Sequence, residues 1–137
     1  NIIELYAPLT ASPQYRERAL DKWYKQRFYE LLPALIEHWQ GIIPVRAKNW
    51  RLRKMKSRWG TCNTVAQRIW LNLDLIKKPL PCLEYVLVHE LVHLIERGHN
   101  QRFYALMTQF LPDWQKRRKQ LNSGPLPAAA PPPQLQQ

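Results

Sequence analysis

The chain has 137 residues, 45% of them hydrophobic, with six tryptophans, which is enough for one domain with its own core and excludes a chain that is disordered throughout. Its formal net charge of +11 at pH 7 favours anionic partners such as nucleic acid, nucleotides or acidic peptides, although an ordinary solvated surface is an equal alternative. Two cysteines make no disulfide framework, and no apolar run approaches the roughly 20 residues of a membrane span, so we expect a cytoplasmic protein with no membrane partner.

The first predicted element is a long helix over residues 13–40. Ser12 followed by Pro13 is typical of a helix N-cap with proline at the first helical position. Apolar residues then recur at steps of three to five, as on one face of a helix: Tyr15, Ala19, Trp23, Phe28, Leu31, Leu35 and Trp39. Pro33 could kink this helix, and Gly41 is expected to end it.

Residues 42–75 predict a small sheet. Val45 and Ala47 share one parity while Trp50 and Leu52 share the other, which indicates strands on either side of a break between them. Residues 69–75 alternate apolar with polar side chains, the pattern of a half-buried strand. We therefore expect an antiparallel sheet of about three strands between two helices.

Helices are expected over the remainder of the domain, at residues 81–96, 101–111 and 112–122. Pro79 and Pro81 precede the first of them, and Asn100 is a candidate N-cap for the second. The third is short and basic.

The expected fold class is therefore α+β, with a long N-terminal helix, a small antiparallel sheet, a helix that carries most of the histidines, and C-terminal helices. One domain would occupy residues 1–122. Residues 123–137 hold five of the twelve prolines and nothing that could pack a core, so we expect a Pro-rich disordered tail there.

Three of the four histidines lie in residues 88–100, V-H-E-L-V-H-L-I-E-R-G-H-N. His89 and His93 are four apart on a predicted helix, so their rings lie one turn apart on one face and can chelate a single tetrahedral ion. Glu90, one step round the helix, is placed to act as a general base. The alternative is a pair of core histidines, but chance would give H-E-x-x-H roughly once in two hundred such sequences.

Catalytic zinc usually takes three protein ligands, so a third must follow. His99 can be that ligand only if the helix stops and the chain turns back. Gly98 lies where the turn is needed, because glycine accepts a left-handed backbone. Glu96 is the alternative because it shares the helical face, but a straight helix would spread the three groups over ~10 Å. We favour His99.

Such a site predicts hydrolysis of a carbonyl or phosphoryl compound, with Glu90 accepting the proton of water and returning it to the leaving group. The oxyanion also needs a partner, and four residues are candidates by type alone: Arg58, Tyr85, Arg102 and Tyr104. His38 is interpreted as a surface or packing histidine. Cys62 and Cys82 lack C-x-x-C spacing and are interpreted as free thiols.

Three segments carry a combined motif: K-S-R-W-G-T-C at residues 56–62, I-W-L-N-L at 69–73, and V-L-V-H-E-L-V-H at 86–93 with H-N-Q-R-F-Y behind it. Together they resemble the YgjP-like metallopeptidase family, a SprT-like zinc hydrolase of the mini-gluzincin type. The resemblance runs from about residue 19 to residue 121 and implies a zincin-like metallopeptidase domain. It implies His89, His93 and His99 as zinc ligands and Glu90 as catalytic base. Longer relatives carry an N-terminal β-rich portion.

The first functional hypothesis is a zinc metallopeptidase acting on peptides or proteins. The strand at residues 69–75 could pair with an extended peptide substrate. A second hypothesis keeps the zinc but makes the substrate a phosphorylated small molecule, as in a nucleotide pyrophosphatase. Its basis is charge, because eight Lys or Arg and no acidic residue lie between Glu37 and Asp74.

The third hypothesis is a basic nucleic-acid-associated protein with a protease-like fold. Basic residues interleave with Trp50 and Trp59, and K-R-R-K occupies residues 116–119. Such a surface permits phosphate contacts and base stacking, but no specific DNA-binding motif accompanies it.

Overall fold

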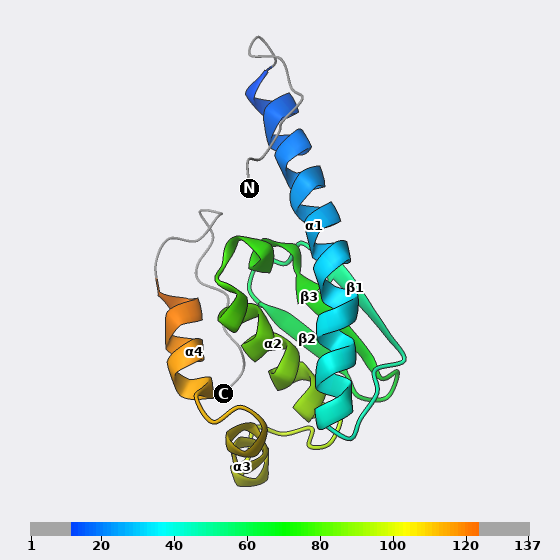
Figure 1. Ribbon diagram of the computed structural model, residues 1–137, viewed down its shortest axis with the longest axis vertical. Coiled ribbons are helices and arrows are strands. Elements are labelled where there is room, and N and C mark those ends of the chain that lie inside the picture. Colours follow the sequence, from blue (N-terminus) through cyan, green and yellow to red (C-terminus); the bar gives the residue numbers. More distant parts are fainter. Residues whose placement is uncertain (1–11, 124–137) are drawn as a thin grey trace.

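The structure, a computed structural model, describes residues 12–123, and the statements below concern this part of the chain. Residues 124–137, almost all of the predicted Pro-rich tail, lie outside it, as do residues 1–11. The α+β fold class is confirmed: the chain forms helices α1 to α4 and a three-stranded sheet. Helices α1 and α2 lie against one face of the sheet, and α3 and α4 lie beyond α2 (Figure 1).

Helix α1, Pro13–Ile42, matches the predicted first helix. The Ser12 hydroxyl accepts a hydrogen bond from the Tyr15 amide at 3.1 Å, so the predicted N-cap is confirmed. The helix continues through Pro33 and ends one residue after Gly41. Its buried residues all lie in the second half of the helix: Phe28, Leu32, Ile36 and Trp39. The first half projects beyond the body of the molecule (Figure 1).

The sheet consists of β1, Asn49–Arg53, β2, Gly60–Asn63, and β3, Arg68–Asn72, in the order β1-β3-β2. Strand β2 runs antiparallel to β3, but β1 runs parallel to it, so the expectation of a purely antiparallel sheet is wrong. The reason is topological. The chain crosses from β1 to the far edge, and the tight β2–β3 turn then inserts β3 between the other two strands. Alternation along a strand does not reveal such an insertion.

The expected strand around Val45 and Ala47 does not form. The Ala47 amide instead donates to the side chain of Gln40 on α1 at 2.9 Å, so its hydrogen bond goes to the helix end and not to a sheet. The predicted last strand ends at Asn72, where the side chain accepts from the Asp74 amide at 3.0 Å. A 3-10 helix, Leu73–Lys77, follows.

The two faces of the sheet differ in chemistry. On the helix side, the register places Trp50, Ile69 and Cys62 in one row, with Leu52, Leu71 and Gly60 in the next. Ile69 and Leu71 are buried in the core. The opposite face carries basic residues and Trp70, which pairs with Arg51 on one side and Thr61 on the other.

Helix α2, Leu80–His93, is the centre of the domain, and nearly all of its residues are buried. Helix α3, Gln101–Phe110, begins at Asn100, whose side chain accepts from the Phe103 amide at 3.0 Å, as the N-cap prediction requires. The short basic helix is also confirmed, as α4, Trp114–Asn122.

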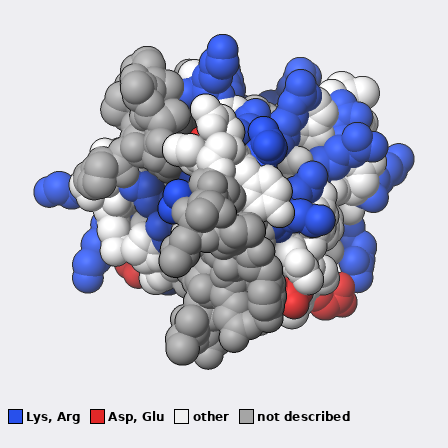
Figure 2. All heavy atoms as spheres, turned by 90° about the horizontal axis from the view of Figure 1, so that it is seen from above, with Lys and Arg blue, Asp and Glu red and all other residues white. Residues whose placement is uncertain are grey.

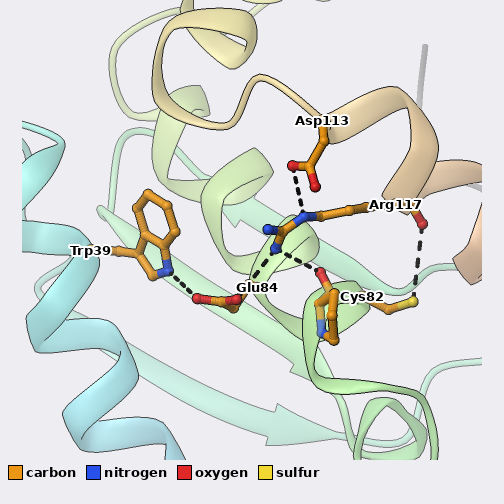
Figure 3. Close-up of polar contacts among 6 residues, drawn as sticks. Trp39, Cys82, Glu84, Asp113 and Arg117 are labelled. Atoms are coloured by element: carbon orange, nitrogen blue, oxygen red, sulfur yellow. Dashed lines mark hydrogen bonds and ion pairs between the residues drawn. The ribbon is translucent and has the colours of Figure 1, made fainter.

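A polar network fastens α4 and α1 to α2 (Figure 3). Glu84 on α2 accepts from the Trp39 indole at 3.1 Å and from the Arg117 guanidinium at 3.3 Å. Arg117 also donates to Asp113 at 2.9 Å. Nearby, Cys82 is a buried free thiol within 4.0 Å of the Arg117 carbonyl. This network lies on the side of α2 that meets α1 and α4. It holds α1 and α4 against α2, the helix that carries His89 and His93.

Candidate metal centre

Three imidazole nitrogens converge at the C-terminal end of α2. The Nε2 atoms of His89 and His93 are 3.2 Å apart, and that of His99 lies 2.9 Å from His93 and 3.2 Å from His89. A tetrahedral ion with bonds of about 2.0 Å would hold its ligand nitrogens about 3.3 Å apart. The donor set therefore fits one small tetrahedral metal ion, and these three residues form a cluster suited to a metal.

The reversal that brings His99 to the cluster begins earlier than expected. Helix α2 ends at His93, and the amides of residues 94–96 close the last turn on the carbonyls of Leu91 and Val92 at 2.9 to 3.0 Å. Gly98 does not adopt a left-handed backbone, and a Cβ there would come no nearer than 3.5 Å to the Asn100 side chain. The expectation of a left-handed Gly98 is therefore wrong, although Gly98 does begin a bend at residues 98–100. The reversal combines the tight closure of α2 with this bend.

The imidazole rings are held by contacts behind them. The Nδ1 of His93 lies 3.1 Å from the Glu96 carbonyl, so Nδ1–H donates there and Nε2 keeps its lone pair for a metal. All three rings pack around Phe103, with ring centroids 4.9, 4.5 and 5.0 Å away for His89, His93 and His99. The local spacing of the sequence does not identify Phe103 as the side chain around which the histidines pack.

The protonation state suits a metal. Burial, reinforced by the neighbouring histidines, lowers the pKa of His89 well below its usual range. Burial also lowers the pKa of His93, and with the charges of His93 and Arg58 it lowers the pKa of His99 to about 4. All three imidazoles are therefore neutral near pH 7, the form that coordinates a metal.

Glu90 is 3% exposed and lies against the backbone of Gly60 on β2. A Cβ at Gly60 would lie 3.0 Å from the Glu90 Oε2 and 2.9 Å from a methyl of Val86, so only glycine leaves this space. Burial raises the pKa of Glu90 to about 8, and the charge of Arg58 partly opposes this. Local sequence patterns do not reveal that Gly60 supports Glu90, because the contact joins residues thirty positions apart.

A cavity of about 590 Å³ contains the three histidines and Glu90. Its other wall includes the whole of β2, with Thr64 and Val65 after it, and three arginines: Arg58, Arg68 and Arg97. Strand β2 is an edge strand, whereas β3 is hydrogen-bonded on both sides. The expectation that the strand at residues 69–75 could pair with a substrate is therefore wrong, because β3 has no free edge.

Of the four candidates for an oxyanion partner, only Arg58 lines this cavity. Tyr85 is buried with its ring 5.8 Å from that of His89, and Tyr104 stacks on Trp114 at 5.4 Å. Arg102 pairs with Glu96 at 3.3 Å.

Among the described residues, the remaining candidate ligands do not join the three-histidine cluster. The Glu96 carboxylate accepts from Asn100 at 3.0 Å as well as from Arg102, so it points to the N-terminus of α3. His38 packs edge-on against Trp39 on α1. Cys62 lines the cavity as a free cysteine, and burial raises its pKa to about 12, which keeps it a thiol. Within residues 12–123, no helix is long and apolar enough to cross a membrane.

Comparison with known proteins gives two findings. The model of a family described as YgjP-like, metallopeptidase domain, matches residues 1–124. Among solved structures, the metallopeptidase zymogen abylysin of Pyrococcus abyssi has a similar fold, with a TM-score of 0.59 and 20% sequence identity over 65% of this chain and 90% of that one. No curated protein matches.

Proposed function

The chain belongs to the YgjP-like metallopeptidase family, and on that premise we propose that it is a zinc-dependent peptidase in which His89, His93 and His99 hold the metal and Glu90 is the catalytic base. One observation carries the proposal: three neutral imidazole nitrogens, 2.9 to 3.2 Å apart, share a cavity with a buried carboxyl group. Nitrogen ligands in a tetrahedral arrangement favour zinc over magnesium or calcium, which prefer oxygen.

A zinc ion, when bound, would act as a Lewis acid that acidifies water and polarises the peptide carbonyl. Glu90 accepts the proton of the attacking water and passes it to the leaving amine. Without a metal, burial raises the pKa of Glu90 to about 8 and keeps it protonated near pH 7, whereas the positive charge of a bound zinc would favour the carboxylate form that accepts the proton. Arg58 offers a positive charge on the same wall of the cavity and is our candidate for stabilising the oxyanion.

The free edge of β2 supports a peptide substrate. Its backbone lines the cavity beside Glu90, and an extended peptide can add to an exposed strand edge through main-chain hydrogen bonds. Main-chain hydrogen bonds do not depend on the side chains of the peptide, so this mode of binding accepts many peptide sequences. Sequence specificity then comes from the side chains around the cavity.

Hydrolysis of a phosphorylated small molecule is the second candidate, because three arginines line the cavity. The described residues offer nucleic acid no recognition feature beyond positive charge. The cytoplasmic location of the protein stays a prediction.

The first experiment measures bound metal by mass spectrometry on protein purified without an affinity-tag metal. We expect near-stoichiometric zinc in the wild type, lost in His99→Ala and retained in Glu96→Ala, whose carboxylate contacts Asn100 and Arg102. Zinc lost in Glu96→Ala but retained in His99→Ala, or no zinc uptake by the wild type, would contradict the proposed ligand set.

The second experiment measures hydrolysis of a mixture of unrelated peptides by the zinc-loaded protein. We expect cleavage by the wild type and a loss of at least about 100-fold in Glu90→Gln, with zinc content unchanged. A Glu90→Gln variant as active as the wild type would remove Glu90 from the mechanism.

A further inference from the structure

The charged side chains that line the cavity are mostly positive. Arg58, Arg68 and Arg97 line it, and Glu90 is its one acidic residue among those that the structure describes. Because Glu90 is buried and is engaged in the proposed proton transfer, nothing on the open walls balances the arginines. Figure 2 shows that Lys and Arg also spread widely over the face seen from above. A test must therefore separate the charge of the cavity from that of the surface.

The three arginines are not committed to ion pairs within the described residues. No carboxylate of residues 12–123 lies within ion-pair distance of them. Arg102 and Arg117, which lie outside the cavity, each pair with a carboxylate at 3.3 Å. The guanidinium groups of the cavity are thus available to an anionic ligand.

The position of Arg68 is fixed by the sheet. It pairs with Asn63 at the end of β2 opposite to Gly60, where Glu90 lies. An extended chain rises about 3.3 Å per residue, so Arg68 lies about three residues along β2 from the proposed reacting bond. The Arg68 guanidinium also lies over the ring of Trp70 at 5.2 Å, a contact that restrains it on the open face of the sheet.

We propose that this cavity selects acidic peptides, and that Arg68 binds the carboxylate of an Asp or Glu about three residues from the bond that is cleaved. Arg97 and Arg58 add positive potential to the same cavity. A partly buried, restrained guanidinium binds a carboxylate through two parallel hydrogen bonds, which gives geometric selectivity as well as attraction. This inference rests on the proposed peptidase function and adds its substrate class.

The test measures binding of short labelled peptides to the zinc-loaded Glu90→Gln variant by fluorescence anisotropy, so that no peptide is cut. The peptides differ at one position, which carries Glu, Gln or Lys, and this position is moved along the sequence in both directions from a common centre. We expect the best Glu peptide to bind about tenfold more tightly than its Gln counterpart, and added salt to reduce the difference.

Arg68→Glu, made in the same background, should abolish this preference or reverse it toward Lys. Lys116→Glu is the matched control, because it changes the net charge equally at an exposed site on α4 outside the cavity. Arg68→Gln removes the positive charge without reversing it, and its fold and zinc content are checked by circular dichroism and mass spectrometry. It tests the same preference if the charge-reversed variant misfolds. An equal preference in Arg68→Glu, or a loss of preference in Lys116→Glu as well, would overturn the proposal.

Cleavage by the wild-type protein separates this inference from the function on which it rests. If Glu and Gln peptides are cut at equal rates, the peptidase function stands and the acidic selectivity is wrong. If no peptide is cut but a nucleoside triphosphate is hydrolysed, both proposals fail, and the arginines serve a phosphate instead.

Discussion

Glu90 can occupy its position only because Gly60 has no side chain. A methyl group at Gly60 would stand 3.0 Å from the Glu90 carboxylate and 2.9 Å from Val86, so the carboxylate and the strand must separate. Since proton transfer depends on position, we expect Gly60→Ala to lower peptide hydrolysis by roughly 10- to 100-fold. The three atoms nearest to a Cβ at Gly60 belong to Val86 and Glu90 and none to a histidine, so the zinc content should remain unchanged.

Gly98→Ala is the control for this variant, because a Cβ at Gly98 meets only the Asn100 side chain, at 3.5 Å. It should retain zinc and most of its activity. Equal damage in both variants would mean that glycine matters at these positions for a reason other than the space beside Glu90.

The buried carboxyl of Glu90 also makes the stability of the metal-free chain depend on pH. Because burial raises its folded pKa from 4.5 to about 8, the folded chain holds a proton that the unfolded chain releases. The associated stability is complete below pH 4.5 and is lost as the pH rises to about 8. We expect Glu90→Gln to raise the free energy of unfolding of the metal-free protein by roughly 2 to 4 kcal/mol near pH 8, and by little near pH 4.5.

Chemical denaturation across this pH range measures the effect. Glu37→Gln is the control, since the Glu37 side chain is 73% exposed and should show no such trend. A difference between Glu90→Gln and the wild type that stays constant with pH would show that Glu90 is not buried as a neutral acid.

The sequence predicts the role of a single residue best where residue types that can bind a metal or transfer a proton also lie at helical spacing. His89, Glu90 and His93 follow from one helical turn. His99 required the chain to reverse, and the reversal differs from the expectation in that α2 ends already at His93 and Gly98 bends the chain without a left-handed backbone. Gly60 and Arg68 could not be assigned to the site from local spacing, since Gly60 meets Glu90 through the packing of β2 on α2 and Arg68 joins the cavity lining through its place opposite Asn63 in the sheet.

At the scale of elements, the loop between β1 and β2 depends on Asn72. Its side-chain amide donates to the carbonyls of Met55 at 3.0 Å and Arg58 at 2.8 Å, and its own amide donates to the Trp59 carbonyl at 2.9 Å. This buried residue therefore sets the conformation of the segment that brings Arg58 to the cavity.

Asn72→Asp should destabilise the fold by roughly 2 to 4 kcal/mol, because a buried carboxylate would face two carbonyl oxygens with no proton to donate. Thermal unfolding measures this change. Asn63→Asp is the matched control: the exposed Asn63 side chain only accepts, from the Ala66 amide at 2.9 Å, and a carboxylate can do the same. Equal stability of the two variants would contradict the role assigned to Asn72.

The elements also show why the helices and a three-stranded sheet could be predicted but the parallel pairing of β1 with β3 could not. Helices α1 and α3 carry their signals within their own residues, in the caps at Ser12 and Asn100 and in apolar positions that recur along one face. The parallel pairing of β1 with β3 is a relation between segments, and the residues of β2 do not alternate over enough positions to mark a strand.

For the whole molecule, the metal site and the hydrophobic core are separate sources of stability. The core is continuous from α1 through the sheet to α4 without any contribution from a metal. We therefore expect the metal-free chain to keep its helical circular dichroism spectrum, unlike small domains that fold only around zinc. Zinc would add the connection between α2 and the segment leading to α3.

Zinc at about a thousandfold excess over its dissociation constant should stabilise the native state by about 4 kcal/mol, which for a domain of this size raises the Tm by roughly 10 °C or more. Chelation should reverse this shift, and His99→Ala should show a Tm that does not respond to zinc. Because the pKa of His99 is lowered to about 4, its imidazole remains neutral at about pH 6, where exposed histidines are largely protonated. The zinc-dependent shift in Tm should therefore persist at about pH 6 and disappear only under more acidic conditions.

Complete unfolding on chelation would show that the hydrophobic core is not stable without the metal. A zinc response that vanishes at about pH 6 would show that the imidazoles are more exposed to water than they are in the structure.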